Sequence, residues 1–376
     1  MSFRYGPGIN KPGFNALAAQ TTTYTYELWS WGQNSSGQLG LGNTTSYSSP
    51  KQVGALTSWL TVSSGYQTIA TKTDGTLWVW GRNDFGQLGL GNTTYYSSPK
   101  QVGALTTWLN ISAGRRSSTY AVKTDGTLWA WGLNTSGQLG LGNTTNYSSP
   151  KQVGALTTWS TTASGYDVVG AIKTDGTLWM WGNNVAGQLG NGASGASVNS
   201  PNQVGALTTW VSVSINWQST IALQSNGTMW SWGQNVSYGA LGLGNTTDYS
   251  SPKQIGALTT WSKAVASQYF GVAVKTDGTL WAWGANTYGQ LGLGNVTYYS
   301  SPKQVGALTA WLKIATAYGF VFSIKTDGTL WSWGFNQNGR LGLGDITSRS
   351  SPIQVGALTT WFVASAGPAQ TIALKY

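Results

Sequence analysis

The chain has 376 residues, of which only 8% are charged, and its formal net charge is +10. It contains no Cys and no His, which excludes thiol and imidazole nucleophile–base pairs and the usual zinc ligand sets. Trp is frequent, with 22 residues, and its placement decides the predicted fold.

Residues 1–22 precede the periodic part of the chain and are rich in Gly and Pro. They lack the apolar core of a signal peptide, and no apolar run in the chain approaches the roughly 18 residues of a membrane span. We expect these residues to form an extended arm that contacts an assembly partner. The residues expected to make this contact are Phe3, Arg4, Tyr5 and Phe14.

The remainder, residues 23–376, consists of a repeated unit. Each unit carries Trp-x-Trp-Gly, and from the second copy on the closing Trp recurs every 50 or 51 residues. In the second unit the strand-like segments are residues 59–63, 68–72, 76–80 and a short stretch around 99–102. They are separated by turn signals, among them the tight hairpin signal Thr73-Asp74-Gly75. A repeat of this length with four short strands predicts one β-propeller blade per unit.

The two ends of the periodic part complete each other. Residues 24–31 read as a third strand with no first or second strand before it, and residues 361–376 read as a first and a second strand. The sequence therefore predicts an all-β fold, a seven-bladed β-propeller of four-stranded antiparallel blades. N- and C-terminal strands that share one blade are expected to close it.

These motifs resemble those of the regulator of chromosome condensation repeat family. The resemblance rests on Gly-Gln-Leu-Gly, a later Pro and Val, and Asp-Gly-Thr-Leu-Trp-x-Trp-Gly, and it covers roughly residues 23–376. It implies functions that range from nucleotide exchange on a small GTPase, with chromatin binding, to inhibition of β-lactamases. The family often has a His at the start of the second strand, where this chain has Gln67, Ser117 or Asp167. Since no repeat carries a wedge-like insertion either, nucleotide exchange is not expected.

The carboxylates argue against an enzyme. Of the ten Asp and Glu residues, five occupy the same hairpin turn, where Asp is a preferred turn former. The other five lie in different units, so a paired-carboxylate site would have to assemble across blades. The sequence predicts no catalytic residue, no metal, no cofactor and no enzymatic activity.

The excess positive charge is spread around the predicted rim. A Lys on an exposed edge strand protects that edge against aggregation. Lys residues predicted to lie on outermost strands are Lys51, Lys100, Lys151, Lys253 and Lys303. Because nucleic acid is normally bound by a clustered basic patch, nucleic-acid binding is not expected, and neither is membrane insertion.

Two classes of connection differ between the copies. The turns with Lys-Thr-Asp-Gly and Gln-Val-Gly-Ala-Leu are nearly unchanged, whereas the connections after the first strand and after Trp-Gly vary. In an up-and-down blade the two varied connections open on the same side, which we call the variable face; the other side is the uniform face. Aromatic residues and Arg anchor protein interfaces, and aromatic rings stack on sugars. The residues expected to bind a ligand around the channel mouth are Tyr66, Arg115, Arg116, Tyr166, Trp217, Tyr269, Phe270 and Phe320.

We expect a non-enzymatic recognition or structural module. An arm before a rigid head of near-identical repeats looks similar to virion appendage or decoration proteins of bacterial viruses, which assemble in the host cytoplasm. Such a protein would bind a host-surface glycan or a protein partner through the variable face. The alternative is a free cytoplasmic propeller that binds protein, such as an enzyme inhibitor or a chromatin-type or nucleic-acid-associated adaptor.

Overall fold

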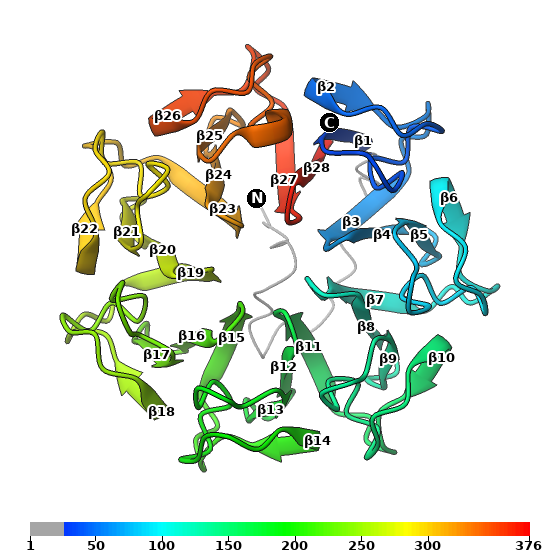
Figure 1. Cartoon of the computed structure of the whole chain (residues 1–376), viewed down its shortest axis with the longest axis horizontal. Helices are drawn as coiled ribbons and strands as arrows, with labels where there is room; N and C mark the ends of the chain where they lie inside the picture. The colour runs from blue at the N-terminus through cyan, green and yellow to red at the C-terminus, as the bar shows by residue number, and fades with distance from the viewer. Residues whose placement is uncertain (1–25) are drawn as a thin grey trace, which may run out of the picture.

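The computed structural model describes residues 26–376, so the expected arm, residues 1–22 with Phe3, Arg4, Tyr5 and Phe14, lies outside the described residues. Seven four-stranded antiparallel sheets surround a central axis, which confirms the predicted fold (Figure 1). The only helical segment in the described part of the chain is the 3-10 turn η1 (Gln337–Gly339).

The strands of each blade follow one another from the axis outward (Figure 1). Blade 1 consists of β3 (Trp59–Ser64), β4 (Gln67–Lys72), β5 (Leu77–Gly81) and β6 (Tyr96–Gln101). Blade 2 consists of β7 (Trp108–Ala113), β8 (Ser118–Lys123), β9 (Leu128–Gly132) and β10 (Tyr147–Gln152). Blade 3 consists of β11 (Trp159–Ser164), β12 (Val168–Lys173), β13 (Leu178–Gly182) and β14 (Val198–Gln203). Blade 4 consists of β15 (Trp210–Ile215), β16 (Ser219–Gln224), β17 (Met229–Gly233) and β18 (Tyr249–Gln254).

The remaining blades complete the ring. Blade 5 consists of β19 (Trp261–Ser267), β20 (Phe270–Lys275), β21 (Leu280–Gly284) and β22 (Tyr299–Gln304). Blade 6 consists of β23 (Trp311–Ala317), β24 (Phe320–Lys325), β25 (Leu330–Gly334) and β26 (Arg349–Gln354). Blade 7 consists of β27 (Trp361–Ala366), β28 (Gln370–Lys375), β1 (Glu27–Gly32) and β2 (Tyr47–Gln52).

The second Trp of Trp-x-Trp-Gly joins neighbouring blades. In blade 2 the buried indole Nε1 of Trp131 donates to the Gln87 carbonyl of blade 1 at 2.9 Å. Equivalent bonds of 2.8 to 3.0 Å start from Trp31, Trp80, Trp181, Trp232, Trp283 and Trp333. The last glycine of Gly-Gln-Leu-Gly makes room for this contact, because a Cβ on Gly89 would lie 2.7 Å from Trp131 Nε1. The two motifs are therefore the two sides of one contact between blades.

The first Trp of Trp-x-Trp-Gly is hydrogen-bonded to the Asp-Gly-Thr turn that precedes it. Asp125 Oδ1 accepts hydrogen bonds from the Thr127 N–H and hydroxyl at 2.9 and 2.6 Å, and Trp129 Nε1 donates to Thr127 Oγ1 at 2.9 Å. The bonds from Thr127 hold the pKa of Asp125 below its usual value. The Lys123 ammonium lies 3.7 Å from the centre of the Trp129 ring. The Asp is a structural turn residue, and a cation–π contact holds the Lys.

The C-terminal strand closes the ring as predicted. β28 pairs with β27 on one side and with β1 on the other, so blade 7 contains both ends of the described chain. The Arg340 carbonyl of blade 6 accepts from Trp31 Nε1 at 2.9 Å and from the Thr371 hydroxyl at 3.0 Å. Blade 7 therefore contacts its neighbour in the same way as an uninterrupted blade.

Candidate functional site

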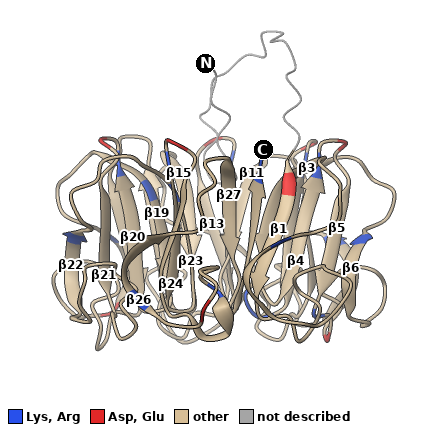
Figure 2. Cartoon of the chain, turned by 90° about the horizontal axis from the view of Figure 1, so that it is seen from above, with Lys and Arg blue, Asp and Glu red and all other residues tan. Residues whose placement is uncertain are grey.

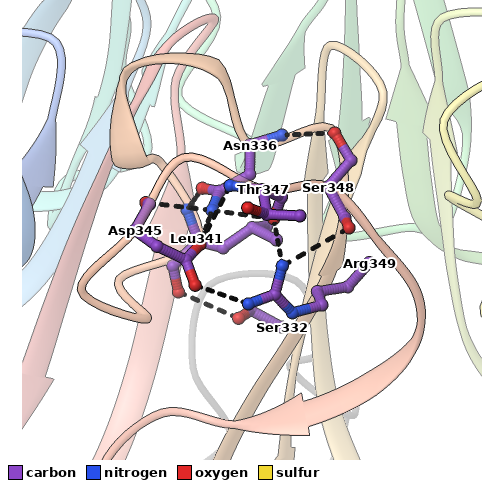
Figure 3. A network of polar contacts seen from close by, with 7 residues as sticks. All are labelled: Ser332, Asn336, Leu341, Asp345, Thr347, Ser348 and Arg349. Carbon is purple, nitrogen blue, oxygen red and sulfur yellow. Dashed lines mark hydrogen bonds and ion pairs between the residues drawn. The ribbon is translucent and has the colours of Figure 1, made fainter.

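The strands run between two faces that bear the loops, as the edge-on view shows (Figure 2). On the variable face a buried Asn organises each long connection after Trp-Gly. In blade 6, Asn336 Nδ2 donates to the Asp345 and Thr347 carbonyls at 3.1 and 3.0 Å (Figure 3). Its Oδ1 accepts from the Leu341 N–H at 2.9 Å, and Arg349 pairs with Asp345 at 2.5 Å. Hydrogen bonds thus hold the loop framework while the residues that it presents differ between blades.

Aromatic side chains of blades 3, 4 and 5 form a continuous row on the variable face. Tyr166 stacks on Trp217 with ring centroids 5.1 Å apart, and Trp217 lies 6.5 Å from Tyr269. Tyr238 continues the row, 4.8 Å from Tyr269 and 5.6 Å from Tyr298. We call these five residues the aromatic arc. Trp217 and Tyr298 are 41% and 42% exposed, so the arc presents ring surface to solvent.

Tyr269, at the centre of the arc, has a left-handed backbone conformation with φ +64°. It belongs to the two-residue turn between β19 and β20, and the equivalent position in blade 6 is Gly319, with φ +73°. Local strain of this kind is typical of functional sites. An aromatic residue at a position suited to Gly is therefore consistent with a role for its ring.

A fixed polar group bounds one end of the arc. The Arg116 guanidinium lies 5.3 Å from the centre of the Tyr166 ring and donates to Asp167 Oδ2 at 2.6 Å. Asp167 is buried and also accepts from Gln138 Nε2 at 3.0 Å. Burial raises the pKa of this carboxyl, and the bond from Arg116 opposes the shift. Arg116 thus presents a positioned, exposed cation beside the arc.

A second aromatic group lies on blades 5 and 6. Tyr288 stacks on Phe335 with centroids 4.2 Å apart, and Tyr318 lies 6.4 Å from Phe335. Arg340, which stands where five other blades have the Gln of Gly-Gln-Leu-Gly and blade 4 has Ala240, lies 4.6 Å from the Phe335 ring centre. Burial lowers the pKa of Arg340 to about 10. Its buried guanidinium thus lies between Phe335 and the core residue Phe320, 5.6 Å from the Phe320 ring centre.

Tyr66 lies half-buried on the turn between β3 and β4 of blade 1. The Arg82 guanidinium lies 5.1 Å from the centre of its ring, and Arg82 pairs with Asp84, which also accepts from the Tyr95 hydroxyl. Burial raises the pKa of Tyr66. Blade 1 therefore presents a polar group built around Tyr66, on the same face as the arc.

Arg115 lies at the axis, as expected, but its guanidinium is directed across the central channel. Its Nη2 donates to the Thr316 carbonyl of β23, on the far side of the ring, at 2.7 Å. The walls of the channel surround the side chain, although part of its surface still faces the cavity, and burial lowers its pKa to about 10. Arg115 is thus a residue of the channel and not of the aromatic surface.

The expected placement of Phe270 and Phe320 at the channel mouth is wrong. They are 1% and 0% exposed and belong to the cores between blades. Ser267 pairs directly with Phe270 across a two-residue turn, so each Phe is the first residue of a strand instead of the last residue of a loop. In blade 4 the Asn216 N–H donates to the Ser219 carbonyl, so Trp217 is a residue of the turn itself and remains outside.

Three further residues belong to these sites although the sequence motifs did not single them out: Tyr298 in the arc, and Lys263 and Lys313 in the channel. The two Lys occupy the third position of the inner strand. Other blades have Thr61, Asn110, Thr161, Ser212 and Val363 there. Alignment of the inner strands would have revealed the two added cations. The contact of Tyr298 with blade 4 depends on how two loops approach, which repeat spacing does not determine.

The described residues contain no group of three or more acidic, His or Cys side chains placed to hold a metal ion. Residues 26–376 also contain no helix with the length and apolar character needed to cross a bilayer. The site therefore consists of aromatic surface and positioned cations on a rigid propeller. The fold that carries this candidate site is that of a seven-bladed β-propeller.

The chain belongs to the regulator of chromosome condensation (RCC1) repeat family. The repeat matches seven times, over residues 27–70, 74–121, 125–172, 175–223, 226–274, 277–324 and 327–374. A second form of the same repeat matches residues 108–138 and 261–290. This result confirms the resemblance found in the sequence motifs.

Solved structures share the architecture at low sequence identity. Human WBSCR16 superposes with a TM-score of 0.83 at 19% identity, covering 93% of this chain and 98% of that chain. Prp20p from Saccharomyces cerevisiae, studied for its binding to Gsp1p and histones, gives 0.81 at 18% identity, covering 94% and 92%. Yeast RCC1 (Prp20) bound to Kap60 gives 0.82 at 18% identity, covering 100% and 94%. At this level of identity the likeness establishes the fold.

Proposed function

We propose that this protein is a non-enzymatic recognition module that binds a surface glycan or a protein partner through the aromatic arc. The proposal rests on one observation, the unbroken row of rings from Tyr166 to Tyr298 on the variable face. Rings of this kind bury large apolar area at low entropic cost and stack on sugars or on partner side chains. Arg116, fixed by Asp167, adds directional hydrogen-bond donors at one end.

The family comparison supports binding in general but does not name the ligand. Prp20p was studied for its binding to Gsp1p and histones, and yeast RCC1 (Prp20) was solved bound to Kap60, so a protein partner is one candidate class. A glycan is the other, because the five residues of the arc are aromatic and uncharged. Binding to an immobilised glycan would indicate the glycan class, and crosslinking to a protein would indicate the protein class.

A test combines an immobilised glycan array with a photo-crosslinking residue placed at the exposed position 236, in the same connection as Tyr238. Trp217→Ala should lower glycan binding by about tenfold or more, as for other central aromatic anchors. Tyr95→Ala, an aromatic change on the same face in blade 1, and Leu156→Ala on the uniform face are the controls; both side chains are exposed. If neither the array nor the crosslinker distinguishes Trp217→Ala from these controls, the arc is not the binding surface.

Nucleic acid is the competing ligand class. Exposed rim lysines such as Lys100, whose ammonium lies 5.5 Å from the centre of the Tyr96 ring, belong to the outermost strands of the blades. Phosphate-driven binding would weaken steeply with salt and would respond to Lys100→Ala and Lys151→Ala. Binding that follows this pattern and ignores Trp217→Ala would replace our proposal by a polyanion-binding function.

We also propose a virion setting, in which residues 1–22 attach the propeller to a particle assembled in the host cytoplasm. This proposal rests on the Gly- and Pro-rich composition of those residues. Removal of residues 2–20 should leave the propeller folded and abolish incorporation into the particle. Incorporation at normal occupancy would place the attachment elsewhere.

A further inference from the structure

The inner strands of all seven blades enclose an axial cavity of about 320 Å³. Most of its lining residues belong to the innermost strand of each blade, and these strands surround the centre of the ring in Figure 1. Its lining includes three cationic side chains, Arg115, Lys263 and Lys313, and none of the described lining residues is Asp or Glu. Three positive charges are thus gathered in one channel whose described walls carry no negative charge.

One end of the cavity carries the guanidinium of Arg115, and the other end carries the ammonium groups of Lys263 and Lys313. Arg115 reaches the Thr316 carbonyl at 2.7 Å, which uses one of the five N–H donors of a guanidinium. Lys313 Nζ donates to the Phe362 carbonyl at 2.6 Å and lies 3.5 Å from the centre of the Phe362 ring. These carbonyls fix the positions of the cations without neutralising them.

Lys263 repeats the arrangement of Lys313 one blade earlier. Its Nζ donates to the Leu312 carbonyl of the next blade, as Lys313 does to Phe362. Burial and the charge of Lys263 lower the pKa of Lys313 to about 8. Two ammonium groups at equivalent positions of adjacent blades therefore act on each other, and an anion between them would relieve the repulsion.

Serine hydroxyls between the two ends provide neutral donors. The Oγ atoms of Ser63 and Ser214 accept backbone N–H bonds of 2.9 Å from the next blade, and Ser365 Oγ accepts one of 3.0 Å. Because a hydroxyl both accepts and donates, each of these bonds leaves the hydroxyl proton for an acceptor in the cavity. Cations at the ends with hydroxyl donors between them suit an oxyanion.

We propose that the axial channel binds a phosphate-type oxyanion of about the size of pyrophosphate. Lys313 and Thr316 are three residues apart on β23, which separates the two cationic ends by about 10 Å along the strand. A ligand with two phosphoryl groups can approach both ends, whereas a single small ion can contact only one at a time. The phosphoryl groups are those of a free inorganic anion or of a nucleoside diphosphate. This site is separate from the aromatic arc and does not depend on the proposed function.

The test measures binding of sodium phosphate, sodium pyrophosphate and ADP by calorimetry at 0.1 M salt, together with the melting temperature. Pyrophosphate should bind saturably, more tightly than phosphate, and raise the melting temperature. Lys313→Met and Arg115→Met should each weaken binding by tenfold or more. Lys100→Met, which removes the same charge from the exposed rim, is the matched control and should bind like the wild type. Tighter binding of pyrophosphate than of ADP assigns the site to a free anion, and the reverse order assigns it to a nucleotide.

A second variant keeps the proposal testable if the Met variants fold poorly. Ser212 lines the channel one blade before Lys263, at the equivalent position of its strand. Ser212→Asp places a carboxylate inside the cavity, so it should stabilise the protein and abolish pyrophosphate binding. The proposal is overturned if neither pyrophosphate nor ADP saturates by 1 mM, if Lys100→Met loses as much affinity as Lys313→Met, or if Ser212→Asp binds normally.

Discussion

Tyr269 has a backbone conformation, φ +64°, that costs an ordinary L-residue about 1–2 kcal/mol and Gly almost nothing. Tyr269→Gly should therefore be more stable than Tyr269→Ala by about 1–2 kcal/mol, although Gly is normally the less stable of the two in a folded chain. Both variants lose the ring that contacts Trp217 and Tyr238 and should lose ligand binding equally. Urea denaturation of the two variants measures the difference.

Leu156 provides a control for this comparison, because it is exposed on the uniform face. Leu156→Gly should be no more stable than Leu156→Ala. If Tyr269→Ala proves as stable as Tyr269→Gly, the turn at Tyr269 carries no strain, and its aromatic side chain needs no functional explanation.

Lys313 makes the stability of the protein depend on pH. Its pKa is lowered from 10.5 to about 8, chiefly by burial and then by Lys263. Between these values the unfolded chain binds more protons than the folded chain, so stability rises with pH. The contribution, about 1–3 kcal/mol once solvent screening is allowed for, is absent below pH 8 and complete near pH 10.5.

The difference between wild type and Lys313→Met isolates this effect from other titrating groups. Urea denaturation at intervals from pH 7 to 9.5 should show the wild type gaining stability relative to the variant. A parallel pair of curves would mean that the ammonium is well solvated or already neutralised. Saturating pyrophosphate should also flatten the wild-type curve, because a bound anion raises the pKa of Lys313.

In the connection between the third and fourth strands, blade 6 has an Asp–Arg pair where blade 4 has an Asn–Tyr pair. Asp345 and Arg349 form an ion pair at 2.5 Å, whereas in blade 4 Asn245 Nδ2 donates to the Tyr249 hydroxyl at 3.2 Å. Hydrogen bonds from the Thr347 N–H and from Arg349 outweigh burial and hold the pKa of Asp345 below its usual value. The two substitutions in blade 6 thus depend on each other.

A double-mutant cycle tests this dependence. Asp345→Asn and Arg349→Tyr should each cost about 0.5–1 kcal/mol, since a partly exposed pair is broken, and the double variant should recover most of the loss. The unfolding free energies of the four proteins give the coupling. Strict additivity would show that the residues act independently.

The contact between blades makes a stronger prediction. Trp131→Ala removes a fully buried indole and its bond to the Gln87 carbonyl, and should cost roughly 3–5 kcal/mol in unfolding free energy. Trp217→Ala removes an indole of the same size from the surface and should cost less than about 1 kcal/mol. Similar losses for the two variants would contradict the separation of packing and binding tryptophans.

For the molecule as a whole, the fold could be predicted from the sequence because the repeated motifs contact one another within a repeat or between neighbouring repeats. Trp131 and Gly89 meet between blades, and Asp125 binds its own turn, so periodicity determines both contacts. The site was less predictable. Phe270 is buried because the two-residue turn makes it the first residue of a strand. The direction of Arg115 could not be predicted because its acceptor, the Thr316 carbonyl, lies 201 residues away in the sequence. Neither turn length nor contact across the axis is encoded in the repeat.

The closure of the ring can be tested by removing residues 371–376. β28 pairs with both β27 and β1, and its Ile372, Ala373 and Leu374 are fully buried. Deletion leaves β27 and β1 unpaired on one edge each and removes the hydrogen bond from Thr371 to the Arg340 carbonyl. The expected loss of unfolding free energy is comparable to the whole stability of a typical domain, about 5–15 kcal/mol. We expect the truncated protein to melt far below the wild type and to associate through its open strand edges, as measured by calorimetry and light scattering. Removal of Tyr376 alone, which lies outside β28 and is 51% exposed, is the control and should lower the melting temperature only slightly. A truncated chain that remains monomeric and melts at the wild-type temperature would show that the other six blades hold the ring without this strand.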